Sequence, residues 1–267
     1  MLNNITIGTY LPLNSVIHRL NPLAKIIALI ILLVGVFIIN NLYVYLGSMV
    51  FILILIKIAK LSVGRLLKQV KILYFMFIFL FIINILMLRT GEVVFTIFSF
   101  KVYSGALYQT AIIFFRLTSM VFLSSILTMC TKPLDLTLGI EQLLSPAKKL
   151  GFPAHEVAMM ISIALRFIPT LVEETNKIMI AQTSRGVDFQ ANKLSVKIKA
   201  VISLLIPLFV ASFKRAEELA NAMEARGYNP SAKRTRFVSY RWRYRDNIAM
   251  ICSVLYLGVI VWLIYIN

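Results

Sequence analysis

Long blocks of nearly continuous apolar residues constrain this chain more than any other feature. Five of them are expected to cross a bilayer, over about residues 23–39, 42–59, 70–88, 104–130 and 247–266. A helix needs about 20 apolar residues to cross a hydrocarbon core of about 30 Å. Hydrophobic residues make up 60% of the 267 residues, and the mean hydropathy is +0.85. The sequence therefore predicts an all-α integral membrane protein with about five transmembrane helices.

The distribution of basic residues predicts how these spans are oriented. The net charge is +17, and the 28 basic residues lie on one side of the predicted spans except for Arg89, Lys101 and Arg116. The positive-inside rule assigns that side to the cytoplasm. We therefore expect the N-terminus inside, the C-terminus outside and no nucleic-acid partner, in a multi-pass protein of the cytoplasmic membrane. Residues 1–21 lack the order of a cleavable signal, so we expect the first span to be retained.

A more polar segment, residues 131–246, separates the fourth span from the fifth. The sequence thus divides into a transmembrane region (1–130), a cytoplasmic helical domain (131–246) and a final transmembrane helix (247–267). Within the helical domain, one helix is expected over residues 133–150, interrupted at Ser145-Pro146. Two long amphipathic helices follow, over 156–183 and 194–224, because their apolar residues recur at steps of three and four. Pro169 and Pro207 are expected to kink them.

The two long helices end in matching tripeptides, Ser184-Arg185-Gly186 and Ala225-Arg226-Gly227. Part of this pattern is local, since glycine accepts the left-handed conformation of a helix cap and arginine complements the negative end of the helix dipole. Two copies on matched helices also indicate two equivalent contacts. An arginine fork remains charged and binds a carboxylate at two points. We therefore expect Arg185 and Arg226 to bind two related soluble partners.

Other chemically notable residues support several readings. Arg116 lies inside the fourth predicted span, where it either marks a functional site, or snorkels or pairs with backbone carbonyls near a span end. Cys130, Cys252, His18 and His155 are interpreted as structural, because their spacing fits no metal site.

A basic and aromatic cluster precedes the last span. It is interpreted as an interfacial anchor near anionic headgroups, not as a nucleic-acid site. Its members are Lys233, Arg234, Arg236, Phe237, Tyr240, Arg241, Trp242, Arg243, Tyr244 and Arg245.

Several catalytic signatures do not occur in the sequence. It contains no GxxxxGK[ST] phosphate loop, no HExxH and no GxSxG, and its 11 acidic residues are scattered. We therefore expect neither an enzyme nor a cofactor or metal site in this chain.

Four segments together resemble a known family, the transmembrane T components of energy-coupling factor (ECF) transporters. These transporters are prokaryotic ATP-driven importers of vitamins and metal ions. The resemblance covers nearly the whole chain. It rests on His18-Arg19-Leu20-Asn21-Pro22-Leu23-Ala24-Lys25, Ala164-Leu165-Arg166-Phe167-Ile168-Pro169, Ala181-Gln182-Thr183-Ser184-Arg185-Gly186 and Ala225-Arg226-Gly227.

The resemblance implies a coupling function that depends on other subunits. It places contacts with two ATPase subunits, which bind ATP and Mg²⁺, at Ser184, Arg185, Gly186, Ala225, Arg226 and Gly227. Serine stands at position 184 where alanine is common in the family, and either residue is small. The resemblance also implies contacts with a small substrate-binding membrane protein, the S component. Those contacts would be made by Val157, Ile161, Ala164, Leu165, Ile168, Ile202, Leu205 and Phe209.

Two other functional classes compete with this interpretation. A self-sufficient ATP-driven permease would bind substrate alone and line its spans with polar groups, of which these spans have few. A membrane enzyme would need clustered acids or histidines in residues 131–246. In such importers the S component determines the cargo, so this sequence does not name it.

Overall fold

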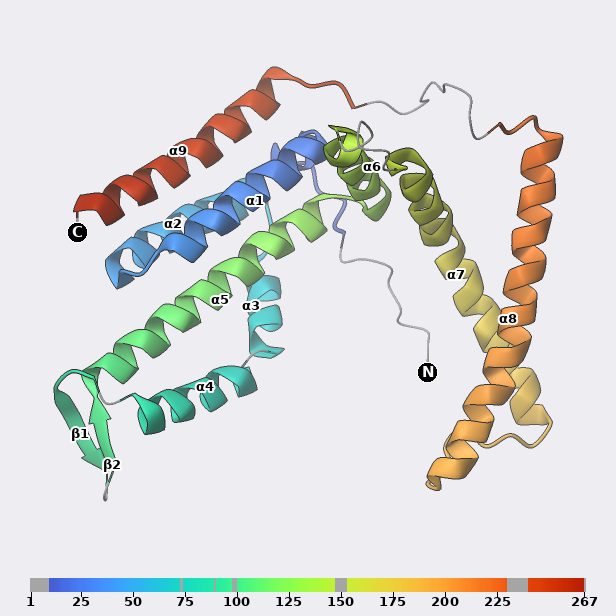
Figure 1. Ribbon diagram of the computed structural model, residues 1–267, viewed down its shortest axis with the longest axis horizontal. Helices are drawn as coiled ribbons and strands as arrows, with labels where there is room; N and C mark the ends of the chain where they lie inside the picture. Colours follow the sequence, from blue (N-terminus) through green and yellow to red (C-terminus); the bar gives the residue numbers. More distant parts are fainter. Residues whose placement is uncertain are drawn as a thin grey trace. The chain divides into compact units, whose positions relative to one another are not determined.

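The computed structural model describes residues 10–72, 74–88, 90–97, 100–146, 153–229 and 240–266 (Figure 1). Nearly all of these residues belong to helices. One short β-hairpin connects the fourth α-helix to the fifth. The elements are η1 (Ile17–Arg19), α1 (Pro22–Ile38), α2 (Leu42–Ile58), α3 (Val63–Ile72), α4 (Tyr74–Met87), β1 (Val93–Ile97), β2 (Phe100–Tyr103), α5 (Ser104–Cys130), α6 (Pro133–Leu144), α7 (Ala154–Ser184), α8 (Leu194–Ala225) and α9 (Tyr244–Ile266).

The chain forms two compact units. Among the described residues, one unit holds residues 10–154 and 240–266, and the other holds residues 155–229. In the sequence, domain boundaries were expected at 130/131 and 246/247. The structure groups α6 with the first unit, where it packs against α1. Each unit is described below on its own.

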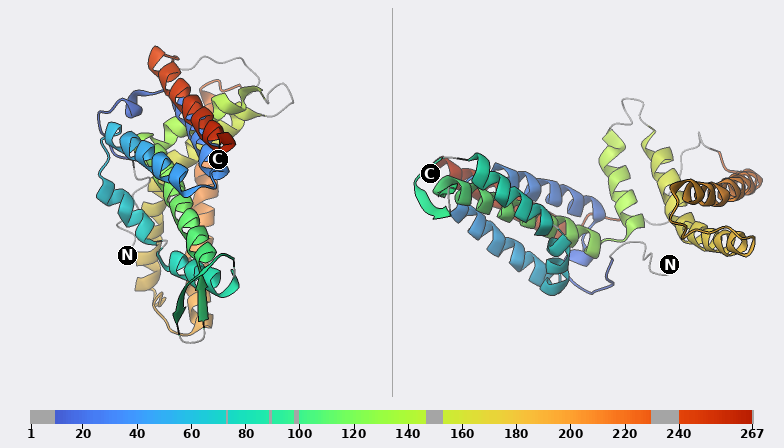
Figure 2. Two further views of the ribbon diagram at one scale, coloured as in Figure 1. Left: turned by 90° about the vertical axis from the view of Figure 1, so that its left-hand side faces the viewer. Right: turned by 90° about the horizontal axis from the view of Figure 1, so that it is seen from below.

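The larger unit is a bundle in which α1, α2, α5 and α9 run along a similar direction (Figure 2). Its core is apolar, and Val36, Tyr45, Ile52 and Ile56 are completely buried. Helix α1 packs against α5, α6 and α9, and α2 packs against α5. Gly35 makes the α1–α9 contact possible, because a Cβ atom there would lie 2.8 Å from the Tyr256 ring.

Helix α1 begins where the sequence supplies the residues of a helix N-cap. Asn21 Oδ1 accepts a hydrogen bond of 2.9 Å from Leu23 N, and Pro22 occupies the first helical turn. The carboxylate of Asp246, which is 2% exposed, accepts hydrogen bonds from Asn21 N and Arg243 N, both at 2.8 Å. Asp246 therefore ties the start of α1 to the start of α9.

The expected third span, residues 70–88, is wrong in its detail. The structure has two helices there, α3 and α4, with axes bent by 55°. Helix α3 starts at Val63, well before the predicted span. It is strongly amphipathic and carries Arg65, Lys68 and Lys71. The charged residues of α3 and the long apolar run of α4 thus lie on two helices that differ in direction.

The prediction of an all-α integral membrane protein is confirmed. Helices α5, α8 and α9 are long and apolar enough to cross a bilayer, as is the bent pair α3–α4 if it is one span. Helices α1 and α2 are apolar over 17 residues each. The antiparallel hairpin β1–β2, in which Ile97 pairs with Phe100, was not expected.

Candidate functional site: the crossed helices α7 and α8

Helices α7 and α8 have the lengths and positions expected from the amphipathic pattern. They contain 31 and 32 residues, which corresponds to a length of about 45 Å each. Both helices continue through their internal prolines, Pro169 and Pro207. The prolines therefore break neither helix, and a kink at these positions stays a prediction.

Helix α7 ends in a complete Schellman cap. Gly186 N donates to Thr183 O at 2.9 Å, and Val187 N donates to Gln182 O at 3.1 Å. Gly186 has a φ of +87°, in the left-handed region that favours glycine. Ser184, Arg185 and Gly186 are all exposed at this end.

Helix α8 ends in the same cap. Gly227 N donates to Glu224 O at 2.9 Å, Tyr228 N donates to Met223 O at 2.9 Å, and φ of Gly227 is +73°. Ala225, Arg226 and Gly227 are exposed, as at the end of α7. The two arginines thus occupy the same capping position on two helices.

The two helices cross at an ion pair. Arg215 Nη2 lies 2.8 Å from Glu174 Oε2, with both side chains about 30% exposed (31% and 27%). The Arg215 guanidinium also lies 5.8 Å from the centre of the Phe167 ring. Beyond the end of α8, Tyr228 Oη lies 3.4 Å from Met159 Sδ, near the start of α7. Since early α7 meets the end of α8, the two helices are antiparallel (Figure 1).

The ion pair joins equivalent positions of a repeated pattern. Glu174 and Arg215 are separated by 41 residues, as are Arg185 and Arg226. Each partner of the ion pair therefore precedes the capping arginine of its own helix by the same number of residues. At 1.5 Å per residue, each arginine lies about 16 Å along its helix from the crossing. Because the helices are antiparallel, the arginines lie at opposite ends of the pair.

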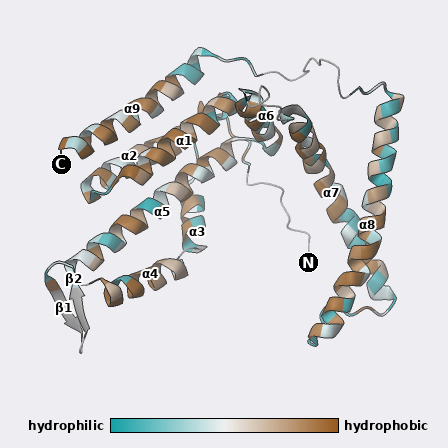
Figure 3. Ribbon diagram, in the orientation of Figure 1, coloured by the Kyte–Doolittle hydropathy of each residue, from teal (hydrophilic) through white to brown (hydrophobic). Residues whose placement is uncertain are grey.

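Both helices expose apolar side chains beside the crossing. Helix α8 is apolar over its first part and hydrophilic toward its C-terminus (Figure 3). Of the side chains predicted to contact an S component, five are exposed and three are half-buried. The exposed ones are Ile161, Ala164, Ile202, Leu205 and Phe209, and the half-buried ones are Val157, Leu165 and Ile168. Phe209 is 62% exposed, so the pair leaves a large apolar surface uncovered.

The surface of α7 and α8 combines exposed charged and exposed apolar side chains. Within the described parts of the chain, no three His, Cys, Asp or Glu side chains gather to hold a metal ion. The charged groups of α7 and α8 that matter here are two exposed arginines and one ion pair that joins the helices.

Comparison with known proteins supports one family. The family model described as CbiQ, cobalt transport protein, matches residues 13–237. The energy-coupling factor transporter transmembrane protein EcfT of Bacillus subtilis is 41% identical over 254 residues, covering 95% of this chain and 96% of the relative. The EcfT protein of Brevibacillus brevis is 42% identical over 262 residues, covering 98% and 99%. The Listeria innocua EcfT is 38% identical over 263 residues, again covering 98% and 99%.

The chain belongs to the family of ECF transporter transmembrane proteins. Membership makes it a membrane component of a transporter complex and confirms the resemblance inferred from the sequence. The segment that begins with His18 is explained by packing in this ECF component. Besides the Asn21 cap, Lys25 Nζ donates to His18 O, Cys130 O and Thr131 Oγ1 at 3.0–3.3 Å, which ties α1 to the end of α5.

Arg116 has a structural partner set in this ECF component. Its Nε donates to Tyr45 Oη at 2.8 Å, and Nη2 donates to Ile39 O at 2.9 Å and to Asn40 Oδ1 at 3.2 Å. Ile39 caps the end of α1. Arg116 thus pairs with one backbone carbonyl at the end of α1 and with two side chains.

Two cysteines and two histidines were also singled out in the sequence. Cys130 is buried and Cys252 exposed, and both are free thiols. His18 is held by Ser15 and Leu11. The structure does not describe the side chain of His155. Four members of the basic and aromatic cluster also lie outside the described residues: Lys233, Arg234, Arg236 and Phe237.

The described part of that cluster is anchored to the bundle at Tyr240. The Tyr240 carbonyl accepts a hydrogen bond of 3.4 Å from Asn21 Nδ2. Burial raises the pKa of Tyr240 to about 12, and its hydrogen bond with Asp135 acts in the same direction. Arg241, Arg243 and Arg245 are exposed, as an anchor near headgroups requires.

Sequence reasoning missed the ion pair Glu174–Arg215 and the tie made by Asp246. A signal for the ion pair exists, because its members lie at the same offset from the two Arg-Gly ends. Asp246 gives no such signal, since its partners are backbone N–H groups, one of which is remote in sequence.

Proposed function

We propose that this chain is the non-catalytic coupling subunit of an ATP-driven ECF importer. It transmits the ATP-dependent motion of two ATPase subunits to a small membrane S component that binds the substrate, a vitamin or a metal ion. ATP and Mg²⁺ are bound by the ATPases. The observation that carries the proposal is the pair of identically capped, exposed arginines at opposite ends of two crossed helices.

Two equivalent arginines suit two related partners. Each Schellman cap determines where its helix ends. Arg185 and Arg226 therefore have the same local backbone surroundings. An arginine fork binds a carboxylate at two points, and an acidic groove on each ATPase subunit would supply that carboxylate. Motion of either ATPase would then move one end of a stiff helix that is pinned to its neighbour at the crossing.

The exposed apolar faces suit a membrane partner. In the described part of α7 and α8, the buried apolar residues are Ala158 and Ala200. Contiguous apolar surface of this kind marks an interaction site. The S component, with lipid around it, would cover the stripe that includes Ile202, Leu205 and Phe209. With the orientation given by the positive-inside rule, the arginine ends face the cytoplasm, where ATP is available.

Charge reversal at both ends tests the proposal. The variant Arg185→Glu with Arg226→Glu, tagged and purified from native membranes in mild detergent, should lose both ATPases while the S component is retained. A matched control is Lys193→Glu with Arg241→Glu, which reverses two exposed charges away from the two C-terminal Schellman caps and should retain all partners. Retention of the ATPases by the first variant contradicts the proposal. Substrate binding by the chain alone would favour a self-sufficient permease.

A further inference from the structure

The larger unit contains a cavity that the coupling function does not use. It has a volume of about 200 Å³ and lies among α1, α2, α5 and α9. Its wall is apolar except at Lys25, Arg245, Cys252 and Ser253. Pockets for compact, drug-sized ligands have about 300–1,000 Å³, so this cavity suits part of an elongated apolar chain better than a compact solute.

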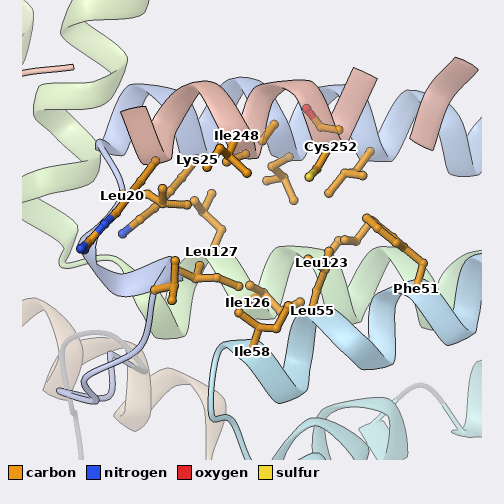
Figure 4. A pocket seen from close by; sticks show the side chains of 18 residues that line it. Leu20, Lys25, Phe51, Leu55, Ile58, Leu123, Ile126, Leu127, Ile248 and Cys252 are labelled. Carbon is orange, nitrogen blue, oxygen red and sulfur yellow. The ribbon is translucent and has the colours of Figure 1, made fainter. Parts of the chain in front are cut away.

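The cavity has a cationic end and an apolar end. Figure 4 shows Lys25 and Leu20 at one end, and Phe51 and Cys252 toward the other. Arg245, at the start of α9, is exposed, and Cys252 lies two turns farther along the same helix. The cavity therefore extends about 10 Å along α9 from its cationic end. Ile58 and Ile248, on opposite walls in Figure 4, are both exposed, and the cavity is partly open to the surroundings of the bundle.

Lys25 is a buried cation with only neutral hydrogen-bond partners. It is 8% exposed, and its Nζ donates to the carbonyls of His18 and Cys130 and to the hydroxyl of Thr131. Burial of a charge without a counter-ion is unfavourable. In the described parts of the chain, no carboxylate lies within ion-pair distance of Lys25.

Two acids act on Lys25 from a longer distance. They are Asp135 and Asp246. The Asp246 oxygens accept hydrogen bonds from Asn21 N and Arg243 N, so this carboxylate is already engaged with the two helix starts. Neither acid lines the cavity, whereas Arg245 does. The end of the cavity that is lined by Lys25 and Arg245 therefore has more positive than negative charge.

We propose that this cavity binds one acyl chain of an anionic phospholipid, with the lipid phosphate at Arg245. The apolar wall takes the chain, and Lys25, already saturated with hydrogen bonds, adds its charge to the attraction of the phosphate. Basic residues at the cytoplasmic surface attract anionic lipids. The positive-inside rule assigns the same surface to this end of the bundle. No residue of α7 or α8 lines the site, and the proposal does not depend on the proposed coupling function.

Lipid retention tests this proposal directly. The full chain, purified with its native partners, is exchanged into micelles that contain phosphatidylglycerol or phosphatidylcholine at equal mole fraction. Native mass spectrometry then counts the lipids retained per chain. We expect about one phosphatidylglycerol and at least tenfold lower retention of phosphatidylcholine. Arg245→Gln should remove this preference, because the phosphate loses its direct partner while the exposed position tolerates glutamine.

Two further variants make the result specific. Arg241→Gln removes an exposed charge from the same segment but outside the cavity wall, so it should keep the preference. Ala249→Phe fills the cavity without a change of charge and should lower retention of either lipid. Equal retention of the two lipids by the unmodified chain overturns the proposal. Equal effects of the two arginine variants overturn it as well, because they would indicate attraction by the whole basic segment.

Discussion

Gly186 and Gly227 are required by backbone conformation and not by crowding. Both have positive φ, and a Cβ atom built on either glycine meets nothing within 4 Å. Alanine would therefore cost only the left-handed conformation, about 1 kcal/mol. The space around each glycine is open, as expected for a helix end that is kept accessible to a partner.

We predict that Gly186→Ala weakens its cap without unfolding α7. A loss of about 1 kcal/mol corresponds to about fivefold faster hydrogen exchange at Val187 N–H, which closes the cap. Gly227→Ala should act in the same way at Tyr228. Gly47→Ala is the control, since Gly47 lies within α2, also with nothing within 4 Å of its Cβ position. Unchanged exchange at Val187 would mean that the cap does not depend on glycine.

His18 joins the N-terminal segment to the bundle in its neutral form. Its Nε2 donates to Leu11 O at 3.0 Å, so Nδ1 is the acceptor for the Ser15 hydroxyl at 2.6 Å. Burial lowers the pKa of His18 below its ordinary value of 6.5, and the charge of Lys25 acts in the same direction, against the Leu11 hydrogen bond.

The His18 contribution to stability should be lost on acidification. Because its folded pKa is lowered, the unfolded chain binds a proton first as the pH falls below 6.5. We predict that the drop in melting temperature between pH 7.5 and 5.5 is smaller in His18→Gln than in the unmodified chain. His155→Gln, at the only other histidine, is the control. An equal drop in melting temperature in all three proteins would show that protonation of His18 does not lower the stability of the fold.

Among the elements, helices governed by apolar periodicity were predictable from the sequence. Helices α7 and α8 agree with expectation within one or two residues at each end, because caps and period act locally. The bend between α3 and α4 and the hairpin β1–β2 were missed. The bend lies between the part of α3 that carries Lys68 and Lys71 and the apolar run of α4, and a hydropathy pattern does not locate it. The hairpin is short, and its β-branched and aromatic residues were included in a connection.

The candidate site was predictable in its ends but not in its crossing. Arg185 and Arg226 are marked by the adjacent glycines, whereas an ion pair between remote helices depends on their packing. The hydrogen bonds of Lys25 and Asp246 are also tertiary contacts, because most of their partners are backbone atoms of other elements.

We predict that Glu174 and Arg215 depend on each other. Glu174→Arg alone, or Arg215→Glu alone, places like charges at the crossing and should lower the melting temperature. The double exchange restores the ion pair in reverse and should recover most of the loss, with a coupling energy of about 1 kcal/mol for a partly exposed pair. The matched control exchanges Glu173 and Lys214, their exposed neighbours in sequence. Additive single effects would show that the pair does not hold the crossing together.

For the whole molecule, the two units differ in how they bury apolar surface. The main core consists of residues from the larger unit, including Tyr45, Ile52 and Tyr256. Helices α7 and α8 keep most of their apolar side chains exposed. The proposed coupling function would account for this difference, because partners would cover the apolar side chains that α7 and α8 leave exposed.

Photo-crosslinking in intact cells tests the central claim most directly. A photoreactive phenylalanine derivative is placed at Ser184, Ala225 or Phe209 in turn, and the adducts are identified by mass spectrometry. The account predicts ATPase adducts from positions 184 and 225, and adducts with a small membrane protein from position 209. Adducts of 184 and 225 with proteins other than ATPases, or ATPase adducts from position 209 alone, would contradict the claim that the capped arginines couple this chain to its ATPases.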